Sequence, residues 1–568
     1  MSSELEREVA RRRTFAIISH PDAGKTTLTE KLLLYGGAIH LAGSVKARRA
    51  RRHVTSDWME LEKERGISVT SSVLQFEYRG HAVNLLDTPG HQDFSEDTYR
   101  TLSAADSAVM LIDAAKGVEP QTKKLFQVCR LRAIPIFTFI NKLDRYGRAP
   151  LDLMHELEQV LGIRAYPMNW PIGMGPEFRG VYDRRAREVH LFSAEGGHGE
   201  SEVSERVLGL DSGAGELLAE RELAQLREDI ELLDVGGDAF SRAKSDRGEI
   251  TPMFFGSAMT NFGVRPFLEA FLDLAPPPAA RATSQGMRQP SDPRFSGFVF
   301  KIQANMDPAH RDRVAFVRVV SGHYTRGMNA FHVRLGKTVR LANPTQFMAA
   351  ERTAIEEAWP GDVIGLFDPG QYRIGDTLAE DGDFEFEGVP RFSPEHFAVV
   401  RARDPMRRKQ MEKGLEQLSE EGTIQIFQQL GMGMRDPIVG VVGPLQLEVL
   451  QYRIEHEYGA DIVLDKLPYG HARWVVGDFD PKTFDWDGNR QTVQDRDGQP
   501  LVLFRDDWAL EHTVEKHPEL KFLAAAPQLR DVALDSRQPS GHIVEALKQS
   551  QHEVEPIRRH GRPPTQRG

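Results

Sequence analysis

Residues 19–26 read Ser19-His20-Pro21-Asp22-Ala23-Gly24-Lys25-Thr26 and lie between a β-rich run, Thr14–Ser19, and a segment with helical apolar spacing, Lys25–Tyr35. A glycine-containing turn between a strand and a helix is the setting in which backbone N–H groups and a helix N-terminus bind phosphate. In such a loop the lysine reaches phosphate oxygens, and the hydroxyl of the next residue is a ligand for Mg²⁺. Ser19 stands where the usual pattern has its first glycine, so the loop alone leaves a chance Gly-Lys-Thr helix start open.

Strand-like and helix-like segments alternate around this loop over the first 160 residues. Val73–Tyr78 and His81–Leu86 flank Arg79-Gly80 and predict a hairpin. Ala108–Ile112 and Pro135–Ile140 are short apolar strands, separated by a helical stretch at about 119–132. Because buried apolar strands that alternate with helices are typical of parallel sheets, we predict a doubly wound α/β domain.

Three further segments follow predicted strands in the order expected of a guanine-nucleotide site. Asp87-Thr88-Pro89-Gly90 places a carboxylate where it can hold the water shell of Mg²⁺ and an N–H where it can meet the γ-phosphate. In Asn141-Lys142-Leu143-Asp144 the aspartate can accept two N–H bonds from guanine, the asparagine can support the loop or the base edge, and the lysine stem can cover the base. Ser257-Ala258 follows the strand Met253–Phe255 and offers a backbone N–H to the guanine O6. An isolated Asn-Lys-x-Asp is also ordinary turn chemistry, so the four elements in this order carry the prediction.

Two segments are candidates for hydrolysis and switching. His91 follows Gly90 directly, where a residue could orient the water that attacks the γ-phosphate, although a surface histidine in a loop is the alternative. Arg65-Gly66-Ile67-Ser68 offers the Ser68 hydroxyl to Mg²⁺ only when the γ-phosphate is present, with Thr70 as a weaker option. A capping or turn hydroxyl is the alternative for Ser68.

Composition excludes several classes of protein. Asp and Glu outnumber Lys and Arg by 83 to 72 over 568 residues, a formal net charge of −11, which argues against a uniformly basic coat for nucleic acid. The single cysteine, Cys129, excludes a disulfide framework and a cysteine-based zinc site. The sequence has no run of about 18 apolar residues, and its charged N-terminus lacks the apolar core of a secretory signal. We therefore expect a cytoplasmic protein without a membrane span.

The organisation predicted for the whole chain is an α/β P-loop GTPase domain followed by an antiparallel β-barrel domain and an α+β domain. A loosened, acidic pattern with a helical segment at Glu216–Leu233 predicts an insertion in the first domain. A polar tail poor in aromatic residues predicts disorder. The predicted boundaries are 1–278 for the nucleotide-binding domain with the insertion at about 165–250, 279–294 for a linker, 295–388 for the barrel, 389–537 for the α+β domain and 538–568 for the tail.

Together these segments resemble the translational GTPases. The resemblance spans about residues 5 to 530 and rests on Ser19–Thr27, Ser56–Ser68, Leu86–Arg100, Asp113–Glu119 and Asn141–Asp144. Within that group, Ser19, Ser68 and the three-domain length favour the factors of translation termination. A translocase would carry threonine after Gly66-Ile67 and would need further C-terminal domains.

The resemblance implies a ribosome-dependent GTPase that promotes departure of the decoding, class I release factors after peptide release. It implies GTP or GDP and Mg²⁺ as ligands, ribosomal RNA and proteins as partners, a monomeric chain, and neither membrane nor DNA binding. His91 is the implied catalytic residue, and Thr26 and Asp87 are implied metal ligands, to which Ser68 is added from the argument above. The implied nucleotide-binding residues are Ser19, His20, Pro21, Asp22, Ala23, Gly24, Lys25, Thr26, Asp87, Thr88, Pro89, Gly90, His91, Asn141, Lys142, Leu143 and Asp144, and the motif order adds Ser257 and Ala258.

Other functions stay open at this point. One is a ribosomal GTPase of the elongation type, and another is a ribosome-associated assembly factor that uses its nucleotide structurally. A metabolic P-loop kinase is disfavoured by Asn141–Asp144. The Arg-dense segment Lys46–His53 fits contact with ribosomal RNA phosphate and fits a solvated charged loop equally well.

Overall fold

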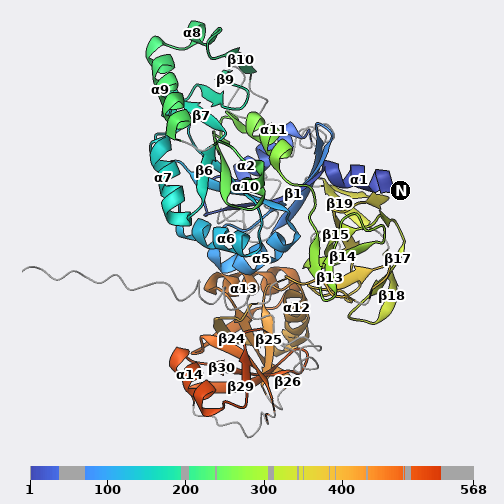
Figure 1. The fold of residues 1–568 in the computed structure, drawn as a ribbon. Coiled ribbons are helices and arrows are strands. Elements are labelled where there is room, and N and C mark those ends of the chain that lie inside the picture. Colours follow the sequence, from blue (N-terminus) through green and yellow to red (C-terminus); the bar gives the residue numbers. More distant parts are fainter. Residues whose placement is uncertain are drawn as a thin grey trace, which may run out of the picture. The chain divides into compact units, whose positions relative to one another are not determined.

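The computed structural model describes residues 2–37, 71–193, 204–236, 239–304, 313–341, 344–348, 351–382, 384–389, 392–429, 433–477, 479 and 488–525 (Figure 1). Ser68, Thr70, the Arg-dense segment Lys46–His53 and the tail 538–568 lie outside the described residues. None of the helices in the described ranges is long and apolar enough to span a membrane.

A seven-stranded sheet forms the centre of the first domain, with strand order β2-β3-β1-β4-β5-β11-β6. β2 and β3 form the predicted antiparallel hairpin, and the other neighbours are parallel. Every residue of β1, β4, β5 and β11 is buried, as expected for parallel strands covered on both faces. The strands are β1 (Arg12–Ser19), β2 (Ser72–Tyr78), β3 (His81–Asp87), β4 (Ser107–Asp113), β5 (Ile136–Asn141), β6 (Arg164–Pro167) and β11 (Ile250–Phe255).

Helices cover both faces of this sheet. Side chains alternate along a strand, so Phe15 and Ile17 of β1 join one apolar core while Ala16 and Ile18 join the other. The first core also contains residues of α2 and α11, and the second contains residues of α6 and α7. The helices of this domain are α1 (Ser2–Arg11), α2 (Lys25–Tyr35), η1 (Gln92–Phe94), α5 (Ser95–Ala104), α6 (Pro120–Leu131), α7 (Pro150–Leu161) and α11 (Val264–Leu274).

Between β6 and β11 the chain builds a separate antiparallel sheet, with strand order β10-β9-β8-β7. The sequence pattern put the insertion at about 165–250, whereas β6 pairs in parallel with β11 and so belongs to the central sheet. The Trp170 indole N–H donates to Asp229 at 2.9 Å and ties the long helix α9 to β7. The elements are β7 (Asn169–Ile172), η2 (Gly175–Glu177), β8 (Gly180–Asp183), β9 (Glu188–Ser193), β10 (Ser204–Gly209), α8 (Ala214–Leu217), α9 (Glu220–Gly236) and α10 (Arg242–Asp246).

A small hairpin, β12 (Arg281–Thr283) and β13 (Gly286–Arg288), occupies the stretch that its polar sequence predicted to be a linker. Long-range contacts hold this hairpin in place. Arg288 is buried and donates to the Ser321 hydroxyl at 3.0 Å and to both Asp381 oxygens.

The second domain is built on an eight-stranded antiparallel sheet with strand order β18-β17-β23-β14-β15-β22-β19-β20. Its long strands β14 and β15 are buried along their whole length because each faces two cores. Val299 and Val317 point into the core of this domain, whereas Phe298 and Phe316 join a core of the α/β domain. The strands are β14 (Ser296–Ala304), β15 (Arg313–Ser321), β16 (Tyr324–Thr325), β17 (Asn329–His332), β18 (Lys337–Arg340), β19 (Pro344–Met348), β20 (Glu351–Ala354), β21 (Glu357–Ala358), β22 (Val363–Phe367) and β23 (Thr377–Ala379).

The third domain combines an eight-stranded antiparallel sheet, order β27-β24-β26-β25-β29-β30-β28-β31, with helices. Apolar residues of α12 and α13, such as Leu415 and Leu450, pack on one face of this sheet. The predicted order of an α/β domain, an antiparallel barrel domain and an α+β domain is thereby confirmed. The elements are β24 (His396–Ala402), η3 (Pro405–Arg407), α12 (Arg408–Glu420), β25 (Gln425–Gln429), β26 (Gly433–Val441), α13 (Pro444–Tyr458), β27 (Ile462–Leu467), β28 (His471–Val476), β29 (Arg490–Asp495), β30 (Pro500–Phe504), α14 (Asp507–Lys516) and β31 (Lys521–Leu523).

A buried ion pair joins the α/β domain to the barrel domain. The Asp106 carboxylate accepts hydrogen bonds from Arg318 and from Arg281, the latter at 2.9 Å. The Asp106 and Arg318 side chains are 0% and 2% exposed. Removing one partner of such a pair leaves an uncompensated buried charge.

We expect Asp106→Ala to lower the free energy of unfolding by about 3–5 kcal/mol, because Arg318 stays buried without its counter-charge. Urea denaturation followed by tryptophan fluorescence measures this loss. Asp211→Ala is the matched control, since Asp211 pairs with Arg227 at the surface and should leave the unfolding midpoint unchanged. Equal midpoints for the two variants would contradict the importance of the buried pair.

Candidate nucleotide-binding site

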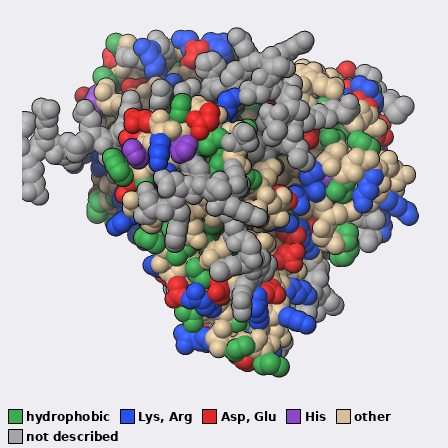
Figure 2. Space-filling model, turned by 90° about the horizontal axis from the view of Figure 1, so that it is seen from below, with side chains coloured by type: hydrophobic (Ala, Val, Ile, Leu, Met, Phe, Trp, Pro, Cys, Tyr) green, Lys and Arg blue, Asp and Glu red, His purple; other side chains and the backbone are tan. Residues whose placement is uncertain are grey.

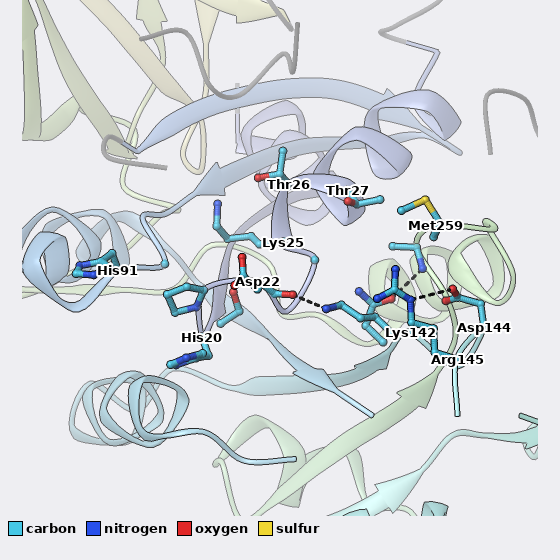
Figure 3. A pocket seen from close by; sticks show the side chains of 16 residues that line it. His20, Asp22, Lys25, Thr26, Thr27, His91, Lys142, Asp144, Arg145 and Met259 are labelled. Carbon is cyan, nitrogen blue, oxygen red and sulfur yellow. Dashed lines mark hydrogen bonds and ion pairs between the residues drawn. The ribbon is translucent and has the colours of Figure 1, made fainter. Parts of the chain in front are cut away.

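The parallel strands bring the four predicted motifs to one edge of the central sheet. Ile17 of β1 is in register with Asp87 of β3, and Phe255 of β11 is in register with Ile140 of β5. The loops that follow these strands surround a pocket of about 400 Å³, a size typical of small-molecule sites (Figure 3).

Most of the predicted site residues line this pocket. Those brought together in its wall are Ser19, His20, Pro21, Asp22, Gly24, Lys25, Thr26, Gly90, His91, Asn141, Lys142, Asp144 and Ala258. Thr27, Arg145 and Met259 also line it and were not predicted. Each directly follows a predicted motif, so extending the motifs by one residue would have found them.

The other predicted residues lie behind the lining. The Thr88 hydroxyl donates to the Ile17 carbonyl at 2.7 Å, and the Pro89 carbonyl accepts from the Thr98 hydroxyl. Leu143 is fully buried in an apolar core. The residues behind the lining are Ala23, Asp87, Thr88, Pro89, Leu143 and Ser257, whereas Ser68 lies outside the described residues.

The phosphate loop owes its shape to Gly24. This residue has φ +97°, a conformation that side chains disfavour, and α2 begins at the next residue. A Cβ at position 24 would also lie 2.4 Å from Asn141 Nδ2, so the close approach requires glycine. The helix N-terminus formed in this way faces the pocket and suits an anion.

Lys25 and Asp87 form a buried ion pair at the floor of the loop, with Lys25 Nζ 2.6 Å from Asp87 Oδ1. The Ser19 hydroxyl is also buried, and within the described chain it has no hydrogen-bond partner. These groups lie at a helix N-terminus. The ammonium suits phosphate oxygens, and the carboxylate and the hydroxyl oxygens suit a hard cation such as Mg²⁺. No cluster of three His, Cys, Asp or Glu side chains able to hold a metal occurs among the described residues.

Asn141 connects two loops of the pocket. Its Nδ2 donates to the Ala23 carbonyl at 2.9 Å, and its Oδ1 accepts from the Ala258 N–H at 2.9 Å. The Ser257 N–H donates to the Phe262 carbonyl. Each of the two candidates for the backbone N–H predicted to meet guanine O6 therefore has an acceptor within the chain, and a contact to the base would require an exchange of partner.

One end of the pocket gathers Lys142, Asp144, Arg145 and Met259, as Figure 3 shows. Asp144 Oδ1 accepts a hydrogen bond from the Ser257 hydroxyl at 2.6 Å, which fixes the carboxylate. Lys142 Nζ donates to the Asp22 carbonyl at 2.5 Å, so its stem runs along the pocket wall. Met259 is 53% exposed and offers a second apolar surface there.

His91 lies at the opposite end of the pocket, with its ring directed away from Lys25 (Figure 3). Its Nδ1 accepts a hydrogen bond from the Asp93 N–H at 3.2 Å, and its side chain is 33% exposed. The ring is therefore held within its own loop and is partly exposed.

Known families account for three consecutive parts of the chain. Residues 10–277 match the model of the elongation factor Tu GTP binding domain, and residues 294–381 match elongation factor G domain 2. Residues 386–514 match the model described as class II release factor RF3, C-terminal domain. The first match shows a guanine-nucleotide-binding GTPase domain.

Similar proteins cover nearly the whole length of the chain. A peptide chain release factor 3 of Symbiobacterium thermophilum is 60% identical over 92% of this chain and 99% of that protein. One of Gloeothece citriformis is 57% identical over 92% of this chain and 97% of that protein. A solved structure of a Thermus thermophilus protein shares the fold, with a TM-score of 0.66, 24% identity, and coverage of 86% of this chain and 72% of that one.

These relatives confirm the predicted resemblance to translational GTPases and the predicted GTPase activity. They also favour a termination factor over the elongation-type alternative, because the C-terminal model is specific to release factors. The chain belongs to the peptide chain release factor 3 family.

Proposed function

We propose that this translation-termination GTPase is stimulated by the ribosome and promotes dissociation of the decoding, class I release factors. One observation carries the proposal: a guanine-nucleotide pocket and a release-factor C-terminal domain occur in one chain. Ribosomal RNA and proteins are the proposed partners of a monomer in the cytoplasm that binds neither DNA nor a membrane.

The phosphate end binds and orients GTP. Lys25 exchanges Asp87 for phosphate oxygens, and the N-terminus of α2 faces the same charge. Asp144 accepts the N–H groups of guanine, and the Lys142 stem covers one face of the base. Catalysis by such a site consists of positioning and charge stabilisation rather than covalent chemistry.

Mg²⁺ fits the oxygen donors at this end. Thr26 lines the pocket, and the buried Asp87 carboxylate pairs with its neighbour Lys25. Ser68 is the third proposed ligand. When bound, the ion would neutralise charge on the phosphate oxygens.

His91 positions the attacking water after its ring turns toward the γ-phosphate. The hydrogen bond from the Asp93 N–H holds the ring away from Lys25, so basal hydrolysis is slow. Ribosome binding favours the turned ring and thereby speeds hydrolysis.

The partner is rich in RNA although the chain carries a net charge of −11. Figure 2 shows Lys, Arg, Asp and Glu side chains interspersed over the described part of one face. Local basic clusters, rather than a uniform field, therefore make the RNA contacts. Lys46–His53 is one proposed cluster.

Ribosomes carrying a bound decoding release factor should raise GTP turnover by about 10³-fold or more. His91→Ala should keep GTP affinity within about twofold and lose roughly 10²–10⁴-fold of the stimulated rate, because water positioning is lost. Single-turnover phosphate release measures the rate.

His155→Ala, at an exposed position on α7, is the matched control and should behave like the parent chain. Full ribosome-stimulated GTP turnover in His91→Ala would contradict the assigned role of His91. Turnover that ribosomes do not change would favour the structural use of GTP. Codon-wise movement of messenger RNA without faster release-factor departure would favour an elongation-type factor.

Asp144→Asn should shift base preference from guanosine to xanthosine nucleotides, because xanthine presents an acceptor where guanine presents the amino group. Loss of a charged hydrogen bond predicts GTP binding weakened by roughly 10–100-fold. Competition between GTP and XTP for the pocket measures the preference. Asp152→Asn, an exposed carboxylate in the first turn of α7, should leave it unchanged. A persistent preference for GTP would show the base-reading assignment to be wrong.

A further inference from the structure

The turn after β4, Asp113–Glu119, has no part in the function proposed above. Asp113 does not line the pocket, yet its Oδ2 accepts a hydrogen bond from Lys142 Nζ at 2.9 Å. It therefore touches a pocket residue from behind.

We propose that Asp113 is a positioning residue for the guanine base: it fixes the Lys142 ammonium so that the Lys142 stem forms one wall of the base slot. The inference rests on the proposed nucleotide contacts and adds a residue on which base affinity depends. Met259 supplies apolar surface at the same end of the pocket (Figure 3).

The sheet register sets this contact. Asp113 at the end of β4 is paired in register with Asn141 at the end of β5. Lys142 directly follows Asn141, so its backbone lies close to Asp113. Lys142 has φ +70°, which is sterically costly for a lysine and is kept only where the surroundings hold it. Its ammonium lies between two acceptors, the Asp113 carboxylate and the Asp22 carbonyl.

Asp113 is itself held in place. Its Oδ1 accepts the Ala115 N–H at 2.8 Å, while Oδ2 is left for Lys142. Burial alone would raise the pKa of Asp113, but hydrogen bonds from Lys142 and from the backbone N–H groups of the turn keep the pKa below its ordinary value. The carboxylate presents a fixed negative charge to the ammonium at neutral pH.

A second carboxylate supports the same turn without touching Lys142. Gly117 has φ +75°, and a Cβ there would lie 2.1 Å from Glu156 Oε2. Glu156 pairs with Arg148 at 2.6 Å and accepts the Val118 N–H at 3.3 Å. A substitution at Glu156 therefore perturbs the turn without removing the hydrogen bond between Lys142 and Asp113.

Asp113→Asn tests the inference in the full-length chain. The amide keeps one oxygen for the Ala115 N–H but loses the charge that faces Lys142. We expect affinity for fluorescent GDP to fall about tenfold, as for loss of a charge-assisted hydrogen bond. Fluorescent IDP should weaken by the same factor, because the stem covers the face of the base and not its edge. In ribosome-stimulated turnover the KM for GTP should rise while the maximal rate is retained.

Lys142→Met completes a double-mutant cycle, since methionine keeps an apolar stem without the ammonium. Asp113→Asn should add no further loss of GDP affinity in this background. Glu156→Gln, the control for the turn, should keep GDP affinity within about twofold.

Three outcomes would overturn the inference. The first is unchanged GDP affinity in Asp113→Asn. The second is a loss of GDP affinity from Asp113→Asn that is as large in the Lys142→Met background as in the parent chain, and the third is a loss in Glu156→Gln as large as that in Asp113→Asn. Should Asp113→Asn not fold, unchanged affinity in Lys142→Met alone would overturn it. If the parent chain binds GDP and responds to ribosomes, these outcomes leave the proposed function standing. A parent chain that binds no GDP would overturn both.

Discussion

The parallel register of the central sheet is the constraint on which the nucleotide site depends. Pairing of Ile17 with Asp87, and of Asp113 with Asn141, ends the strands at one edge and delivers their loops to one pocket. In open α/β sheets, ligands bind in the crevice outside these carboxyl ends. A slip of one residue along β1 would turn Phe15 and Ile17 to the opposite core and carry the phosphate loop away from Lys25's partner, Asp87.

Once the register is set, hydrogen bonds join the loops into one unit. Asn141 links the phosphate loop, through the Ala23 carbonyl, to the loop that contains Ala258. Lys142 makes a second link, between the Asp22 carbonyl and the turn after β4. At the far end of that turn, Glu119 lies 3.3 Å from His20 of the phosphate loop. Loops tied together in this way lose little further backbone freedom on binding, although the Lys25 ammonium and the Ala258 N–H now have partners within the chain that a ligand would have to replace.

Local signals were sufficient for much of the fold and for the core of the site. Helical apolar spacing predicted Lys25–Tyr35, and the structure has the helix at these bounds. The hairpin at 281–288 was missed because it depends on contacts of Arg288 with distant residues, and such contacts leave no periodic trace. The partners of the Ala258 N–H and of Asp113 are equally non-local, so the sequence could name these residues but not the bonds they make.

The loop after β3 connects the pocket to the domain that distinguishes the family. Two residues after His91, the Asp93 carboxylate accepts the Leu445 N–H at 2.7 Å, at the first turn of α13. A Cβ at Gly443 would lie 2.3 Å from the Asp93 side chain, so this approach requires glycine. The same Asp93 supplies the N–H that holds the His91 ring. If the His91 ring turns toward the phosphate loop, as proposed, it loses the hydrogen bond from the Asp93 N–H, and a shift of Asp93 would alter its contact with Leu445. Asp93 therefore contacts both sides: its N–H binds the His91 ring at the pocket, and its carboxylate binds the first turn of α13 in the C-terminal domain.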